Sequence, residues 1–279
     1  EPFHWGHART KDFLTWEELP IALYPDRPYD CGGCWSGTAI VKDETLYLFY
    51  ASIYTPEGAD QIKQTVSVAY STDGIHFEKY ANNPVIACYP AEGGPDFRDP
   101  AVACVDGRFY CVMATGNPEK RVARLLLYES ENLFDWQYSC ILSEWKEAKF
   151  AECPSFMQVG EKCLLTTSVC NLDETHFFSV MYGRFQDGRF YPEVNGNVDK
   201  GPDQYAGQVF TDHKGRNLLI TWIPGWKYAR FAEKDIGCLS VPREITIRNG
   251  KIYGYPVEEV RHLLRDSDPA VTQTDDGFV

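Results

Sequence analysis

Three segments of the chain place acidic side chains beside residues that could hold a sugar. Arg98 precedes Asp99 at the start of an apolar run, where its guanidinium would keep the carboxylate ionised and could also donate to hydroxyl groups. Glu152 is the lone acid of an apolar stretch, and loss of water there would suit it to donating a proton. Asp203 and Tyr205 add an acid and an aromatic ring in a loop. Together these residue types indicate a site that handles a sugar with carboxylates.

Each of these segments also has an ordinary structural interpretation. A buried Asp–Arg pair is more often structural than catalytic, and a glutamate close to a proline is usually solvated. Trp5, Trp35 and Trp226 sit in turns, where they could stack on the apolar faces of sugar rings, although packing between sheets uses the same residues. The residue types alone therefore do not choose between structure and catalysis.

The composition favours a neutral partner. The formal net charge of -13 would repel a nucleic-acid backbone or an anionic membrane, so we expect neither as a partner and a small carbohydrate fits. Solubility alone would explain the same acidity. No apolar run approaches the roughly 18 residues of a membrane span, and no secretory signal is visible at the N-terminus. We expect a cytoplasmic protein.

The ten cysteines do not form a recognisable framework. Most lie inside apolar strand-like runs, as at Cys104, Cys111, Cys163 and Cys238. Scattered in this way, they are typical of reduced core residues. Cys31 and Cys34 have C-x-x-C spacing, but no second pair completes a zinc site and no βαβ pattern surrounds them. We therefore expect no metal or other cofactor.

Short apolar runs separated by clusters of turn residues must position these side chains. Helical periodicity is almost absent, while runs rich in Val, Ile, Tyr, Phe and Leu recur. Examples are 38–41, 45–50, 65–70, 101–105, 108–113 and 218–222. This pattern predicts an all-β protein built from antiparallel hairpins.

A polar turn closed by an aromatic residue recurs along the chain. The aromatic residues are Trp16, Phe77, Trp136, Phe190 and Tyr253, at steps of 61, 59, 54 and 63 residues. Five such units predict a five-bladed β-propeller, because a propeller repeats a four-stranded sheet radially. The first unit falls so early that roughly 45 residues of the first blade are expected to be missing. The alternative is a meander of hairpins with accidental spacing.

Several segments of the chain resemble the motifs of a known family, both in their residues and in their order. In chain order they are H-W-G-H-A from His4, D-F-L-T-W-E-E-L-P-I-A-L from Asp12, G-C-W-S-G from Gly33, R-D-P from Arg98, E-C from Glu152, D-Q-Y-A from Asp203, Trp222, and L-S-V-P-R-E from Leu239. They resemble the W-G-H-A, D-L-x-x-W-x-x-L-P-x-A-L, F-S-G, R-D-P, E-C, D-F-Y-A, G-W and T-L-P-R-E motifs of glycoside hydrolase family 32, the invertases and fructan hydrolases. The resemblance runs from about His4 to Leu264.

This resemblance implies a β-fructofuranosidase that hydrolyses sucrose or fructans with retention of configuration and without a cofactor. Glu152 would be the general acid/base, and Asp99 would stabilise the transition state through the fructosyl hydroxyls. The residues expected to bind substrate are Trp5, Trp35, Ser36, Arg98, Asp203, Tyr205 and Trp222. Residues 1–265 would form the propeller and 266–279 a linker, without the β-sandwich that usually follows in this family. The W-G-H-A and F-S-G-like segments match propellers that cleave arabinan or xylan less well.

The family's nucleophile lies in a W-M-N-D-P-N-G motif upstream of W-G-H-A, and no N-D-P-N-G string occurs in this chain. Without that carboxylate no covalent fructosyl-enzyme can form, so we expect negligible hydrolysis by the chain alone. Two alternatives stay open, an inactive fructoside-binding propeller and a fragment completed by another segment. Loss of a closing strand would expose polar backbone and apolar surface, from which we expect marginal stability or self-association.

Overall fold

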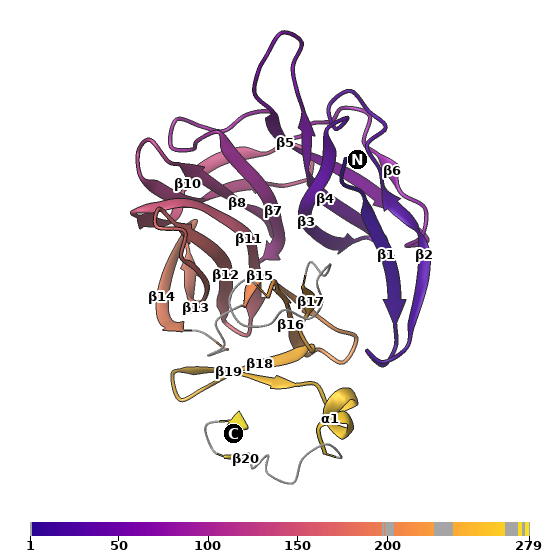
Figure 1. Ribbon diagram of the computed structural model, residues 1–279, viewed down its shortest axis with the longest axis vertical. Helices are drawn as coiled ribbons and strands as arrows, with labels where there is room; N and C mark the ends of the chain where they lie inside the picture. Colours follow the sequence, from indigo (N-terminus) through magenta and orange to yellow (C-terminus); the bar gives the residue numbers. More distant parts are fainter. Residues whose placement is uncertain are drawn as a thin grey trace.

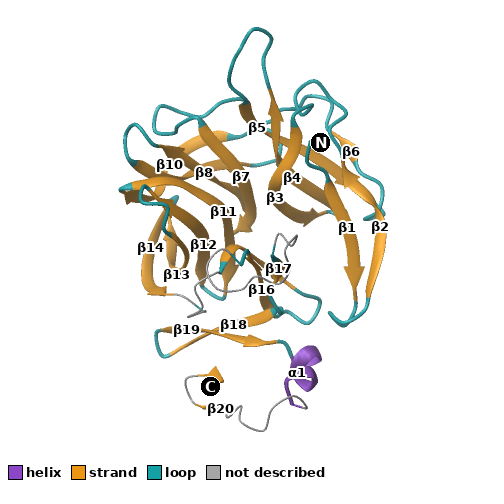
Figure 2. Ribbon diagram, in the orientation of Figure 1, coloured by secondary structure: helices purple, strands orange, loops and turns teal. Residues whose placement is uncertain are grey.

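A computed structural model describes residues 2–196, 198, 204–225, 237–265, 273–274 and 277–278. Within these residues the protein is all-β apart from one short helix, as Figure 2 shows. Three four-stranded sheets, one five-stranded sheet and a two-stranded sheet stand around a common centre (Figure 1). The arrangement is that of a β-propeller, which confirms the predicted all-β propeller, while the five blades and the incomplete first blade stay a prediction.

The strands follow one another in chain order. The two-stranded sheet contains β1 (Trp5–Thr10) and β2 (Trp16–Leu23). The next sheet contains β3 (Gly33–Lys42), β4 (Thr45–Tyr54), β5 (Lys63–Ser71) and β6 (Glu78–Lys79). It is followed by β7 (Asp96–Val105), β8 (Arg108–Asn117), β9 (Val122–Ser130) and β10 (Gln137–Lys146). The fourth contains β11 (Ala148–Val159), β12 (Lys162–Asn171), β13 (His176–Gln186) and β14 (Arg189–Gly196).

The last large sheet contains β15 (Tyr205–Thr211), β16 (Asn217–Ile223), β17 (Cys238–Leu239), β18 (Arg243–Arg248) and β19 (Lys251–Pro256). Helix α1 (Glu258–Arg265) follows, and β20 (Gln273–Thr274) pairs with β21 (Gly277–Phe278). The predicted strand runs fall in β3, β4, β5, β7, β8 and β16, and all pairings are antiparallel between the described strands. Much of the predicted tail at 266–279 lies outside the described residues, so the predicted domain boundary stays a prediction.

The repeated turn marks the last strand of each sheet. Its aromatic residue begins, immediately precedes or lies near the start of β2, β6, β10, β14 or β19. In three of the turns one side-chain oxygen accepts two backbone N–H bonds: Asp12 from Leu14 and Thr15, Asp73 from Ile75 and His76, and Asn132 from Phe134 and Asp135. Such side-chain turns explain why Asp and Asn recur at this place. The turn therefore repeats as a structural unit.

The aromatic residue of the turn packs toward the preceding sheet. Trp136 meets Phe49 edge to face with 5.8 Å between ring centroids, and Phe77 meets His7 at 5.9 Å. Burying such rings between neighbouring sheets supplies both apolar area and a preferred ring geometry. The period of about 60 residues seen in the sequence is thus the period of sheet-to-sheet packing.

The innermost strand of each large sheet carries a β-bulge. The register shifts between Cys34 and Gly37 in β3, Arg98 and Ala101 in β7, Glu152 and Ser155 in β11, and Tyr205 and Gln208 in β15. A bulge bends its strand and re-aims the side chains beside it. Asp99, Cys153 and Ala206 have φ values of 59°, 45° and 50°, a conformation uncommon outside glycine that clusters at functional sites. Four strands therefore turn equivalent residues toward the centre.

Two of the cysteine predictions were wrong. Cys111 and Cys163 are buried as expected, whereas Cys104 and Cys238 are exposed, although all ten cysteines are free. Cys104 lies between the buried residues Ala103 and Val105, and successive side chains of a strand point to opposite faces. An apolar run therefore does not place each of its members in the core.

Cys31 is exposed and Cys34 is buried, with its thiol toward Asp30. Within the described ranges, no group of three or more His, Cys, Asp or Glu side chains has the arrangement of a metal site. The part of the chain that the structure describes also holds no helix long and apolar enough to cross a membrane.

Candidate functional site

A cavity of about 640 Å³ opens where the bulged inner strands meet. Its walls come from β1, β3, β7, β11, β15, β16 and β17, whose inner members converge at the centre of the ring (Figure 1). Seven residues predicted from the sequence line it: Trp5, Trp35, Ser36, Arg98, Asp99, Glu152 and Trp222. These seven residues, up to 217 positions apart in sequence, are thus brought into one pocket by the radial repeat.

Arg98 is the electrostatic centre of this pocket. Its guanidinium nitrogens lie 2.5 Å from Asp96 Oδ1, 2.9 Å from Glu152 Oε1 and 3.9 Å from Asp99 Oδ2, and its side chain is only 10% exposed. Burial alone would lower the pKa of Arg98, but the charges of Asp99, Glu152 and Asp96 raise it above the usual value. One buried cation therefore holds three carboxylates.

Asp99 is almost completely buried beside this cation. Its Oδ2 atom accepts a 2.9 Å hydrogen bond from the backbone N–H of Cys153, and the Cys153 thiol lies 3.6 Å from the same oxygen. Burial raises the pKa of Asp99, while Arg98 and the N–H of Cys153 oppose that shift. The sequence predicted that Arg98 keeps this group ionised; in the folded chain burial outweighs the cation, so the pKa of Asp99 is raised rather than lowered.

Glu152 is held at both carboxylate oxygens. Arg98 donates to Oε1, and the Tyr205 hydroxyl donates to Oε2 over 2.5 Å. Burial raises the pKa of Tyr205, and the carboxylate of Glu152 raises it further, so the phenol stays a donor. The Glu152 side chain is 23% exposed and faces the cavity. A carboxyl group fixed in this way can exchange a proton with a bound molecule.

Tryptophan rings form much of the remaining wall. Trp5 Nε1 donates to the backbone oxygen of Trp35 over 2.9 Å, which ties β1 to β3, and Phe3 packs edge to face on the Trp35 ring. Tyr205 does not line the cavity itself and reaches it through Glu152. Asp203 and Trp226, also singled out from the sequence, lie outside the described residues.

The sequence did not predict a site role for several lining residues, among them Cys153, Gln208 and Leu239. The bulges explain two of them, because C-W-S-G, R-D-P-A, E-C-P-S and Y-A-G-Q occupy equivalent positions in β3, β7, β11 and β15. Aligning the four strings would have identified Cys153 and Gln208. At Gly37, in the first string, an added Cβ would lie 1.8 Å from Phe49 O, so this position requires glycine.

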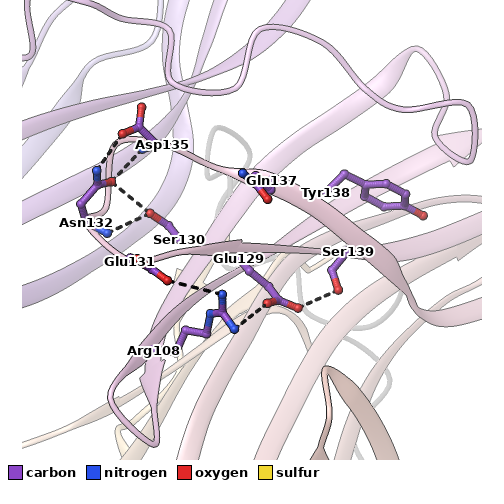
Figure 3. Close-up of a pocket in the computed structure, with 9 residues that line it drawn as sticks. All are labelled: Arg108, Glu129, Ser130, Glu131, Asn132, Asp135, Gln137, Tyr138 and Ser139. Atoms are coloured by element: carbon purple, nitrogen blue, oxygen red, sulfur yellow. Dashed lines mark hydrogen bonds and ion pairs between the residues drawn. The ribbon is translucent and has the colours of Figure 1, made fainter.

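A second hollow of about 510 Å³ lies over β8, β9 and β10 (Figure 3). Arg108 contacts Glu129 at 3.4 Å and Glu131 at 3.8 Å, and Ser139 donates to Glu129. Asn132 and Asp135 bond each other within the repeated turn. These charged groups satisfy one another, so the hollow is a surface ion-pair network rather than a second acid-base site.

Comparison with known proteins assigns the chain to a family. Residues 1–256 match the family described as glycosyl hydrolases family 32 N-terminal domain. Because this match covers most of the 279 residues, the chain belongs to glycoside hydrolase family 32.

The relatives agree with this assignment. A sucrose-6-phosphate hydrolase of Zymomonas mobilis is 32% identical over 96% of the chain and 56% of its own length. A raffinose invertase of Escherichia coli is 33% identical over 96% of the chain and 59% of its own length. Among solved structures, a β-fructofuranosidase of Bombyx mori aligns with a TM-score of 0.80 and 28% identity over 97% of the chain and 59% of its own length. The chain thus spans a little over half the length of these relatives.

Proposed function

We propose that the chain is the propeller part of a β-fructofuranosidase-type glycoside hydrolase that acts on sucrose or fructans with retention. The observation that carries the proposal is that Arg98 holds Asp99 and Glu152 in one pocket walled by Trp5 and Trp35. Its partner is then a small carbohydrate rather than nucleic acid or a membrane, and we propose a cytoplasmic location. The sucrose-bound structure of a Bombyx mori relative supports a fructoside ligand.

The geometry suggests a role for each held group. Glu152 protonates the leaving-group oxygen and later takes a proton from water, which its fixed position beside Arg98 and Tyr205 favours. Asp99 bonds the fructosyl hydroxyls, and its burial strengthens those bonds in the transition state. Trp5, Trp35 and Trp222 stack on the sugar and exclude water.

A retaining reaction also needs a nucleophilic carboxylate. Asp99 and Glu152 are both committed to other contacts, and the 279 residues contain no N-D-P-N-G string. The repeat suggests where the nucleophile would come from, since N-D-P resembles the R-D-P at the β7 bulge. We propose that a segment bearing this motif forms an inner bulged strand beside β1.

The same repeat supports a five-bladed propeller whose first blade is incomplete in this chain. The turn between β1 and β2 matches the turns that join the last two strands of the large sheets, so β1 and β2 occupy the third and fourth places of a blade. Phe13 of that turn packs on Leu218, Val257 and Val260, which closes the ring against the last sheet.

A binding and turnover experiment tests the proposed function. We expect the 279-residue chain to bind fructose or sucrose in calorimetry, to lose binding in Asp99→Ala, and to show negligible hydrolysis. The exposed Glu161→Ala serves as the control variant. Ordinary invertase rates would refute the need for a supplied nucleophile, and an absence of binding would refute the fructoside pocket.

An inactive fructoside-binding propeller would give the same calorimetric result. The DNA upstream of the first codon distinguishes the two, because a stretch that encodes N-D-P-N-G there favours the enzyme. Its absence favours the binding protein.

We also propose that the isolated chain self-associates through the two-stranded sheet. Leu14, Trp16 and Ile21 are 42%, 54% and 52% exposed there. An exposed apolar sheet with unpaired edges is a template for association. Size-exclusion chromatography should show oligomers that grow with concentration and are reduced by Trp16→Lys. A clean monomer at all concentrations argues against this.

A further inference from the structure

A smaller hollow of about 330 Å³ lies beside the candidate active site. Its walls are the end of the β4–β5 loop and the start of β5, residues 61–64, and the segment before β7, residues 88, 89 and 95. The β4–β5 loop stands out from the ring in Figure 2. Because β4 runs antiparallel to β3, this loop lies at the end of the sheets where the inner strands begin and the main pocket opens.

The hollow and the main pocket are connected by the start of β7 and the residue before it. Pro95 lines the hollow, and Arg98 lines the main pocket three residues further along. Three residues of extended chain span about 10 Å. Gln64, which is only 7% exposed, links the start of β5 to β7, since its Oε1 atom accepts a hydrogen bond from the backbone N–H of Phe97 over 3.1 Å. The hollow is therefore a fixed continuation of the pocket wall.

The groups facing the hollow are suited to a neutral sugar. The oxygen of Gln64 is occupied by Phe97, and no bond from its amide nitrogen is formed to any described residue. The Lys63 ammonium lies 6.0 Å from the Tyr54 ring and has no carboxylate partner among the described residues. Tyr89 is 45% exposed, with its ring centroid 6.2 Å from that of Phe97. A supported aromatic ring beside free N–H donors can stack on a sugar and bond its hydroxyls.

We propose that this hollow is an outer subsite that takes a further glycosyl unit of a fructoside longer than a disaccharide. The inference rests on the proposed function, because the unit it binds is attached to the fructosyl group in the main pocket. It makes the protein selective for oligosaccharides over sucrose. A single unpaired cation is a poor anion site by itself, which favours a neutral glycosyl unit over a phosphate.

Calorimetry with ligands of increasing length tests the subsite. We expect a linear fructo-tetrasaccharide to bind the chain about tenfold more tightly than sucrose does, equivalent to about 1.4 kcal/mol. Tyr89→Ala and Lys63→Ala should each remove most of this gain and leave fructose and sucrose binding unchanged. Tyr191→Ala, a tyrosine equally exposed at 45% on β14, should preserve the gain.

The outcomes separate the two proposals. Binding of fructose and sucrose without a gain for the tetrasaccharide overturns the subsite alone, as does a gain that survives both substitutions. An absence of fructose and sucrose binding overturns the proposed function. Tightening by inorganic phosphate or a sugar phosphate, lost in Lys63→Ala and absent for the tetrasaccharide, overturns the neutral subsite in favour of an anion site.

Discussion

Replacing Arg98 with leucine is expected to destabilise the protein by about 3–5 kcal/mol at neutral pH. The substitution keeps the apolar stem and removes the cation that contacts Asp96, Asp99 and Glu152. It leaves carboxylates in a site where the arginine side chain was 10% exposed, and uncompensated buried charge is costly. Urea denaturation followed by tryptophan fluorescence measures the loss.

The loss of stability in Arg98→Leu should become smaller as the pH falls. Burial already raises the pKa of Asp99 in the folded protein, and removing Arg98 raises it further, because the cation opposed that shift. A raised carboxyl pKa means that the folded state binds more protons than the unfolded chain, so stability is retained below the ordinary aspartate pKa and lost as the pH rises through the folded value. Denaturation at about pH 7 and about pH 5 therefore gives a larger deficit at the higher pH.

Arg121→Leu is the matched control. Arg121 also pairs with a glutamate, Glu147, but both side chains are more than half exposed, and such pairs contribute little. Equal losses for the two variants, or a deficit at Arg98 that grows on acidification, would show that the buried cation does not compensate the carboxylates.

Much of the fold could be predicted from periodicity. The recurring turn with Asp12, Asp73 and Asn132 is a local feature, because a side-chain oxygen bonds backbone groups two and three residues ahead. Such local features can be recognised in the sequence, and the spacing of these turns predicted the repeat of the sheets. Cys104 shows what composition cannot predict, since an apolar run does not indicate which face of its strand packs against the core.

The candidate site could be predicted from the sequence only where its residues belong to distinctive motifs. R-D-P and E-C name Asp99 and Glu152, and the structure places both against Arg98. The bond from Tyr205 to Glu152 and that from Cys153 to Asp99 cross between sheets, so no spacing along the chain reveals them. The raised pKa of Asp99 was missed for the same reason, because burial is a property of the assembled ring.

Glu152→Gln is expected to lower sucrose turnover by about 10²–10⁴-fold in the protein completed with a segment that bears N-D-P-N-G. The amide keeps the shape that Tyr205 and Arg98 hold, but it has no proton to give the leaving oxygen. Steady-state assays with sucrose measure this loss, and the first-turnover release of fluoride from a fructosyl fluoride measures formation of the covalent intermediate alone, because fluoride departs without general-acid assistance.

The two substrates separate the role of Glu152 from that of Asp99. In the first turnover, Glu152→Gln should release fluoride much faster than it cleaves sucrose, since fluoride needs no proton from Glu152, whereas the later transfer of a proton from water to Glu152 is lost with both substrates. Asp99→Asn should slow both substrates alike, because hydrogen bonds to the fructosyl hydroxyls are needed whichever group departs. If Glu152→Gln slows the first-turnover release of both leaving groups equally, the carboxyl group bound by Arg98 and Tyr205 is a structural anchor for the pocket and the proton donor lies elsewhere.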